Sequence, residues 1–326
     1  MANVSNYYIQ RKDNLISNKD SYIIGKKYRF TVLSSRLIRL EYSESGIFED
    51  RPTSLVINRK FPKVEYAITE SDTLIQIATN IFTVTYVKDS PFKSGVLGGN
   101  LKASINGTDK EWQINNPEVK NLRAINYSID SVKDKIVLDK GLYSLDGFCV
   151  IDDSKSLVLD DNDTFVERNN HERDLYLFLY NNDFEGCLDD YFTLTGYPPL
   201  ICRYALGAWW YKNDKYSGKD IIDLVNKFNH EKIPISIFLL GNCWHDDVNC
   251  YTPNNSQIDL LGISRFLEQE KIELGVTINP KLEIKKNSLD YSLISNYYKG
   301  DKLSFIPLSN EKLGIYLNLF INTLED

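Results

Sequence analysis

The chain contains few of the residues that build metal centres and disulfide frameworks. Its 326 residues include only three histidines and five cysteines. The cysteines are odd in number, and no two of them form the CxxC pair that is common in zinc sites. We therefore expect no metal site, and we take the thiols to be reduced and mostly structural.

Long hydrophobic runs and blocks of like charge are also missing. No stretch reaches the roughly 18 apolar residues that mark a membrane-spanning helix, and residues 1–14 hold no apolar core of a signal peptide. The 38 basic and 45 acidic side chains give a net charge of −7 and are scattered along the chain. This distribution offers no polybasic surface to nucleic acid or to an anionic membrane. We expect a cytoplasmic protein with neither as a partner.

The first part of the chain, residues 1–195, has the pattern of antiparallel β structure. Apolar and polar residues alternate with the two-residue period of a strand in the segments 28–33, 37–42, 74–78 and 82–87. Turn-forming residues separate these segments. Repeated short strands with polar turns predict an antiparallel β-sandwich. Its core would take most of the 21 tyrosines and 15 phenylalanines, although aromatic residues are also common in sugar clefts.

The pattern changes after Pro198 and Pro199, where strands begin to alternate with helices. Strands are expected at residues 205–210, 235–240 and 273–278, and helices at residues 217–230, 259–270 and from 309 to the end. Such alternation predicts parallel βα units. Three units cannot close an eight-stranded barrel, and the open edge would be an aggregation liability. We assign these units to a second domain, residues 196–326.

Four sequence motifs follow one another along the chain. The first joins the strand at 37–42 to residues 46–53 (GIFEDRPT) and 56–59 (VINR). The others are residues 141–154 (GLYSLDGFCVIDDS), 194–200 (LTGYPPL) and 203–210 (RYALGAWW). In this order they resemble segments of glycoside hydrolase family 31, the family of α-glucosidases and α-xylosidases.

The resemblance implies a fold and a chemistry. It implies a galactose-mutarotase-like β-sandwich in residues 1–195 and the first three βα units of a (β/α)8 TIM barrel in residues 196–326. Members of the family are retaining, exo-acting α-glycosidases with one aspartate as nucleophile and another as general acid/base. Both lie on barrel strands after the third, at the C-terminal face, and neither has a counterpart here. We therefore expect an inactive fragment of an enzyme whose chemistry needs no metal or organic cofactor.

Loops after the first two barrel strands should still line the sugar pocket. Tryptophan can stack on a sugar ring, and asparagine or aspartate can bind its hydroxyl groups. The expected substrate-binding residues are Trp210, Asn213 and Asp214 after the first strand, Gly241, Asn242, Trp244 and His245 after the second, and Asp153 from the sandwich. Structural roles stay open for several of them. By strand alternation only one of Trp209 and Trp210 faces the barrel interior, and Asp153 can instead belong to a turn.

The segment after the second strand departs from the family pattern. Relatives typically carry D-x-D-W there, and the first aspartate binds hydroxyl groups of the sugar at the cleavage site. Here the segment reads Gly241, Asn242, Cys243 and Trp244. Loss of a charged acceptor costs roughly 1.5–3 kcal/mol per hydrogen bond. The change predicts weak catalysis, an altered substrate, or a protein that binds sugar without cleaving it.

The sequence leaves three interpretations open. The chain is part of an α-glycosidase acting on an α-linked oligosaccharide or glycoside, or a degenerate sugar-binding or interaction protein of the same fold, or an incomplete gene product without a function of its own. We favour the first for the family and inactivity for the chain itself. Self-association into a homo-oligomer stays open.

Overall fold

The structure is a computed structural model that describes residues 17–93, 99–114, 120–125, 135–161, 165–168, 173–198, 200–246, 249–253 and 256–277. The chain forms two compact units, Met1–Pro198 and Pro199–Asp326. The helix expected from residue 309 onward lies outside the described residues. Among the residues that are described, no helix is both long enough and apolar enough to cross a membrane.

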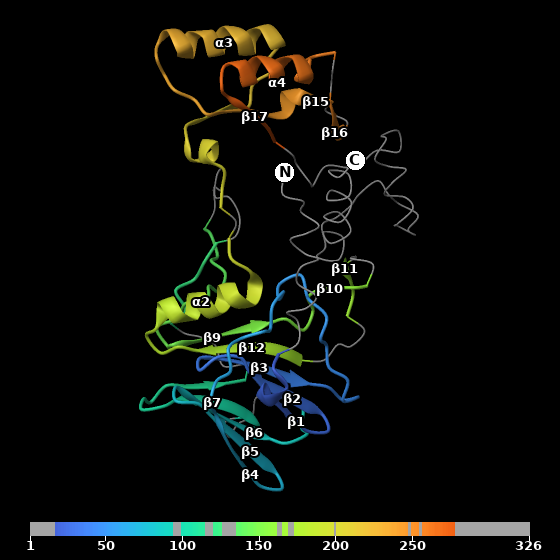
Figure 1. Cartoon of the computed structure of the whole chain (residues 1–326), viewed down its shortest axis with the longest axis vertical. Helices are drawn as coiled ribbons and strands as arrows, with labels where there is room; N and C mark the ends of the chain where they lie inside the picture. Colours follow the sequence, from blue (N-terminus) through green and yellow to red (C-terminus); the bar gives the residue numbers. More distant parts are fainter. Residues whose placement is uncertain are drawn as a thin grey trace. The chain divides into compact units, whose positions relative to one another are not determined.

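The first unit contains two five-stranded antiparallel sheets, with the strand orders β1-β2-β3-β12-β9 and β4-β5-β6-β7-β8 (Figure 1). The first sheet comprises β1 (Tyr22–Ile24), β2 (Tyr28–Val32), β3 (Leu37–Tyr42), β9 (Phe148–Asp152) and β12 (Arg173–Leu179). The second comprises β4 (Ala67–Glu70), β5 (Leu74–Ala78), β6 (Phe82–Val87), β7 (Leu101–Ile105) and β8 (Glu111–Gln113). The four strands expected from alternation are present as β2, β3, β5 and β6, so these predictions are confirmed.

A shared hydrophobic core joins the two sheets. Ile38, Leu40 and Tyr42 of β3 point into it, together with Phe82, Val84 and Tyr86 of β6. Leu37, Arg39 and Glu41, the other three residues of β3, are buried as well. The alternation in β3 therefore separates two buried faces, one apolar and one partly charged, rather than a core face and a solvent face.

The second face of the first sheet is covered by helix α2 (Phe184–Thr195). Its Cys187 and Leu194 join Tyr176 and Phe178 of β12 in a second hydrophobic cluster. The helix begins at Asp183, whose carboxylate accepts a hydrogen bond from the Gly186 N–H at 3.0 Å. Short strands β10 (Val158–Leu159) and β11 (Phe165–Val166) and the 3-10 turn η2 (Lys19–Ser21) also belong to this unit.

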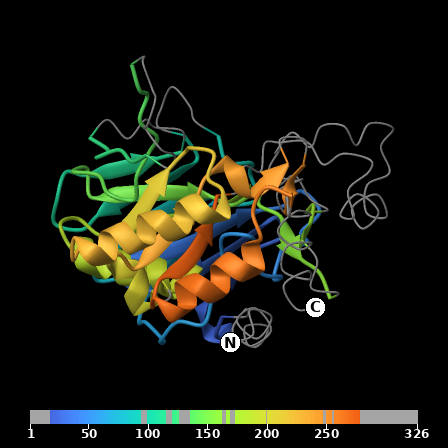
Figure 2. The same cartoon turned by 90° about the horizontal axis from the view of Figure 1, so that it is seen from above.

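The second unit is built on a three-stranded parallel sheet in the order β13-β14-β17. Its elements are η3 (Arg203–Leu206), β13 (Trp209–Lys212), α3 (Gly218–His230), β14 (Ile237–Leu240), η4 (Asn242–Trp244), β15 (His245–Asp246), β16 (Asn249–Pro253), α4 (Leu260–Gln269) and β17 (Glu273–Val276). Helices α3 and α4 lie side by side (Figure 2, in yellow and orange). Ile221 and Val225 of α3 and Ile263 and Leu267 of α4 pack with Phe238 of β14 in one core, so both helices cover the same face of the sheet.

The first strand of this sheet begins later than its sequence predicts. Residues 203–206 form a 3-10 turn, which ends where the Gly207 N–H donates to the Tyr204 carbonyl at 3.0 Å. Strand β13 then runs from Trp209 to Lys212, in parallel register with β14. The apolar run from 205 to 210 therefore divides between a turn and a strand, and the expected strand 205–210 is wrong in its limits. Trp210 consequently lies within the strand and not at its end.

Candidate functional site

The carboxyl ends of the three parallel strands form one edge, where Asn213 and Gly241 directly follow β13 and β14. Lys212, Leu240 and Val276 are aligned across the sheet as the last residues of their strands. The Thr277 N–H donates to the Leu240 carbonyl at 2.9 Å, which extends this ladder by one residue. The next row across the sheet is therefore Asn213, Gly241 and Thr277.

Strand alternation decides which side chains at this edge face the helices. Trp210, Phe238 and Leu274 form one row of the sheet and pack in the helix-covered core. The Trp210 and Phe228 rings meet edge to face, with centroids 5.0 Å apart. The indole N–H of Trp210 is buried and has no hydrogen-bond acceptor among the described residues. Trp210, expected in the pocket, therefore lies on the helix side of the sheet.

The opposite face of β13 carries Trp209 and Tyr211, which are 52% and 50% exposed. The Trp209 indole donates to the Ala205 carbonyl at 3.0 Å. The sequence left open which of the two tryptophans faces which side of the sheet. The structure shows that Trp209, and not Trp210, points away from α3 and α4. Tyr211 was not among the expected residues, although the same period-two alternation could have identified it.

Asn213 and Gly241 lie against each other at this edge. A Cβ atom placed on Gly241 would be 2.6 Å from Oδ1 of Asn213 and 3.2 Å from its Cα. The backbone of Gly241, with φ −76°, is not in the left-handed region. Close approach of Asn213, rather than backbone conformation, therefore favours glycine at position 241.

Trp244 and His245 are packed into the unit rather than displayed at the edge. They are 6% and 3% exposed, and their rings meet edge to face with centroids 5.1 Å apart. The Trp244 indole donates to the Thr277 carbonyl at 2.8 Å, which links η4 to the end of β17. In this arrangement Trp244 offers no open ring face to a sugar.

The remaining candidates of this unit are less informative. Asp214 is half-exposed and forms an ion pair with Lys212. The backbone of Asn242 opens η4, but its side chain lies outside the described residues. No group of three or more metal-ligating side chains occurs in the described part of the chain.

Asp153 belongs to the first unit and is fully buried there. Its two carboxylate oxygens accept from the Thr53 hydroxyl at 3.1 and 3.0 Å, and its N–H donates to the Asp174 carbonyl at 2.9 Å. Burial, reinforced by the charge of Asp174, raises the pKa of the Asp153 carboxyl to about 6. These contacts give Asp153 a structural role within its unit.

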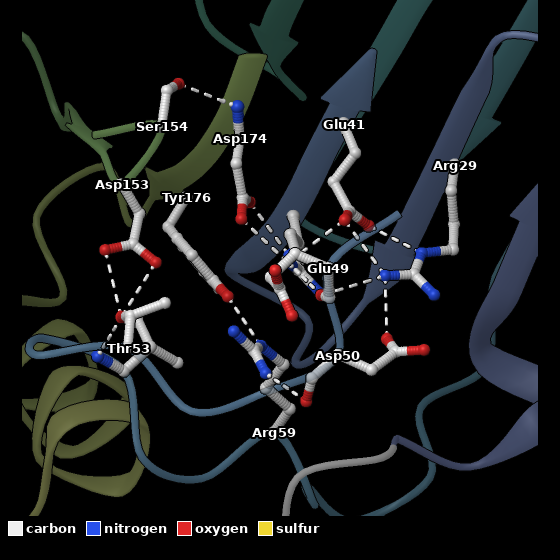
Figure 3. A network of polar contacts seen from close by, with 12 residues as sticks. Arg29, Glu41, Glu49, Asp50, Thr53, Arg59, Asp153, Ser154, Asp174 and Tyr176 are labelled. Carbon is white, nitrogen blue, oxygen red and sulfur yellow. Dashed lines mark hydrogen bonds and ion pairs between the residues drawn. The ribbon is translucent and has the colours of Figure 1, made fainter. Parts of the chain in front are cut away.

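Asp153 borders a network of buried charges that the sequence did not indicate (Figure 3). Arg39 of β3 donates to both carboxylate oxygens of Asp174 on β12, at 2.8 and 2.7 Å. Arg29 of β2 donates to both oxygens of Glu41, at 2.6 and 2.9 Å. The Glu49 carbonyl accepts from Arg39 at 2.8 Å and from Arg29 at 3.2 Å. The network thereby fastens the loop after β3 to the charged face of the first sheet.

The first and second sequence motifs supply the loop side of this network. The GIFEDRPT segment provides the Glu49 carbonyl, and its Asp50 forms an ion pair with Arg29 at 2.8 Å. Arg59, from the VINR segment, donates to the Tyr176 hydroxyl at 2.8 Å and to the Asp50 carbonyl at 3.1 Å. The Asp174 N–H donates to the Ser154 hydroxyl at 2.9 Å. These motif residues therefore hold the first unit together.

Comparison with solved structures gives the fold a precedent. A GH31 α-xylosidase from a soil metagenome, complexed with xylose, matches 85% of this chain and 49% of its own with a TM-score of 0.55 and 11% identity. The cycloalternan-forming enzyme of Listeria monocytogenes, in complex with a pentasaccharide substrate, matches 84% of this chain and 32% of its own (TM-score 0.54, 12% identity). The described fold is that of glycoside hydrolase family 31. The resemblance predicted from the four motifs is thereby confirmed.

Sequence comparison finds a relative over a shorter stretch. An isomaltosyltransferase of Sporosarcina globispora is 27% identical over 81 residues, which are 25% of this chain and 7% of the relative. No protein-family model matches the chain. The chain thus spans less than half the length of the family 31 structures named above and a small fraction of this relative.

Proposed function

We propose that the chain is the sugar-binding portion of a family 31 α-glycosidase. In this proposal the first unit is the family's β-sandwich, and the second unit is the first three βα units of its (β/α)8 barrel. The observation that carries it is the row of loop residues at the carboxyl edge of β13-β14-β17, within a fold shared with family 31 enzymes. Ligands of parallel α/β folds bind at this edge, because the strand-to-helix loops gather there.

The proposed ligand is a terminal α-linked glucose or related sugar of an oligosaccharide or glycoside. The support comes from the bound sugars of similar structures: xylose in the α-xylosidase, and glucose or isomaltotriose in the dextranase of Flavobacterium johnsoniae. Exo-acting, retaining hydrolysis would need two carboxyl groups about 5–5.5 Å apart. Asp214, the acidic residue next to Asn213, forms an ion pair with Lys212. We assign it no role as one of the two reacting carboxyl groups, and we propose that this chain alone binds sugar without hydrolysing it.

A second candidate is a non-catalytic sugar-binding protein of the same fold. The specific observation that favours it is the close approach of Asn213 to Gly241. Glycine stands where relatives typically carry the hydroxyl-binding aspartate, and the Asn213 side chain occupies the space beside it. The two candidates share the binding edge and differ in whether any form of the protein turns over substrate.

One experiment with the full chain tests the proposal. Isothermal titration with isomaltotriose, glucose and xylose measures binding, and release of p-nitrophenol from the α-glucoside and the α-xyloside measures turnover. We expect saturable binding of at least one sugar and no turnover. Failure of all three sugars to bind would refute the proposed function, whereas turnover by the chain would refute its inactivity and the non-catalytic alternative together.

A further inference from the structure

The side chain of Asn106 fastens two turns of the first unit together. Asn106 directly follows β7, and its Nδ2 donates at 3.0 Å to the Thr79 carbonyl, in the turn between β5 and β6. Its Oδ1 accepts from the Thr83 hydroxyl of β6 at 2.8 Å. The Thr79 hydroxyl in turn donates to the Ser35 carbonyl at 3.0 Å, in the turn between β2 and β3. The Asn106 carboxamide, as donor and acceptor at once, therefore links the β7–β8 turn to its neighbours.

Asn106 also forms the one Asn-Gly pair of the chain, with Gly107. The Thr108 N–H donates to the Ile105 carbonyl at 3.2 Å, which closes a turn over this pair. All residues from Asn106 to Asp109 are exposed, and Gly107 has φ +73°, which favours glycine at this turn position. A Cβ on Gly107 would meet nothing within 4 Å, and its N–H donates to no acceptor among the described residues. The peptide nitrogen beside the Asn106 carboxamide is therefore neither crowded nor engaged.

We propose that Asn106 is a deamidation site, at which a neutral carboxamide is exchanged for a carboxylate. The Gly107 nitrogen attacks Cγ of Asn106 and forms an N–Cγ bond. The Cγ–Nδ2 bond breaks, and Nδ2 leaves as ammonia with the proton of the Gly107 N–H. Solvent water then opens the cyclic imide: cleavage of the N–Cγ bond gives aspartate, and cleavage of the original peptide bond gives isoaspartate. The proposal is independent of the sugar-binding function.

The two side-chain hydrogen bonds of Asn106 govern both the rate and the consequence of this reaction. Because Thr79 and Thr83 hold Nδ2 and Oδ1, the carboxamide has to leave both partners and turn toward the Gly107 nitrogen before the imide forms. In the product an oxygen replaces Nδ2, so a carboxylate would face the Thr79 carbonyl. Two acceptors form no hydrogen bond. The reaction therefore removes the side-chain link between the β7–β8 turn and the β5–β6 turn, and does not restore it.

Peptide mapping of the full chain by mass spectrometry, after incubation of the folded protein in mildly alkaline buffer, measures the acid formed at each asparagine. Residue 106 should convert progressively, whereas Asn229, an exposed asparagine of α3 that precedes a histidine, should stay an amide. Thr83→Val removes the hydroxyl that holds Oδ1 and keeps the branched shape, so it should speed conversion about two- to tenfold. Thr85→Val, also at a partly buried position of β6, is the matched control and should leave the rate unchanged.

Asn106→Asp tests the consequence, because it carries the side chain of the product from the start. It should lower the midpoint of thermal unfolding by about 2–4 °C, the shift expected from one lost hydrogen bond. Asn80→Asp adds the same charge at an exposed site of the β5–β6 turn and should not lower it. No acid at residue 106, in the unaltered chain and in Thr83→Val alike, would overturn the site. Equal rates in Thr83→Val and Thr85→Val, or equal midpoints in the two aspartate variants, would overturn the role given to the hydrogen bonds.

Discussion

Arg39 is the residue whose loss should most weaken the first unit. It is 1% exposed, donates to both oxygens of Asp174 and to the Glu49 carbonyl, and lies 3.0 Å from the Glu41 carboxylate. Replacement by methionine keeps an unbranched side chain but removes both hydrogen bonds of Arg39 to the buried Asp174 carboxylate. Arg168 still forms an ion pair with Asp174, and Arg29 still pairs with Glu41. Breaking a buried ion pair by removing one partner costs about 3–5 kcal/mol.

A loss of that size is a large part of the total stability of a domain, which is about 5–15 kcal/mol. For a unit of about 150–250 residues each kcal/mol lowers the midpoint by about 2–4 °C, so Arg39→Met should lower it by roughly 6–20 °C. Urea unfolding followed by circular dichroism measures the change in unfolding free energy. Arg51→Met is the control, because Arg51 is paired with Glu49 on the same loop but is 36% exposed; exposed pairs contribute up to about 1 kcal/mol.

The pH dependence of the stability difference between Arg39→Met and the unaltered chain is a second test of whether the Arg39–Asp174 pair causes that difference. Burial alone would raise the pKa of Asp174, but the charge and hydrogen bonds of Arg39 hold that pKa well below its ordinary value. The folded-state pKa is lowered, so this stabilisation is present above the ordinary pKa and is lost as the pH falls. The gap between Arg39→Met and the unaltered chain should therefore narrow below about pH 4. An Arg39→Met protein no less stable than Arg51→Met, or a gap that widens in acid, would refute this account.

Two further predictions concern a buried carboxyl and a helix cap. The raised pKa of Asp153, about 6 against an ordinary 3.8, means that the folded state binds more protons between these values, so the unfolding free energy should fall by up to roughly 3 kcal/mol as the pH rises from 4 to 6. Asp153→Asn should abolish that slope in urea titrations, and an unchanged slope would assign it to another group. In the second unit, Ser217 accepts from the Asp220 N–H at the start of α3, and Ser217→Ala should destabilise the helix by about 1 kcal/mol. Faster hydrogen exchange in the first turn of α3 is the readout; Ser264→Ala, at an exposed site within α4, should not produce it, and equal exchange in both variants would contradict the capping role.

The strands of the first unit were predictable because local pattern and tertiary environment agree there. In β5 the buried residues alternate with exposed or half-buried ones, as expected of a strand with one core face. In β3 the same alternation separates an apolar core from the arginine and glutamate of the charged network. Sequence alone does not distinguish these cases, because a polar residue reads the same whether it meets water or a buried partner far along the chain.

The candidate site shows a similar division. Alternation required that Trp209 and Trp210 face opposite ways, but the strand limits and the helix-covered side came only from the structure. Packing against Phe228 assigns Trp210 to the helix side. Burial of Trp244 and its bond to Thr277 depend on the fold of η4 onto the end of β17, a contact between residues far apart in sequence.

The sequence by itself determined the family resemblance, the principal strands and helices, and the loss of carboxylates after β14, because these depend on residue identity and short-range periodicity. Only the tertiary structure decided that the GIFEDRPT and VINR motifs join a buried charge network, and that Asn213 fills the space beside Gly241. The reason is physical: close approach, burial and charge pairing are set by distances between segments that the order of residues does not contain.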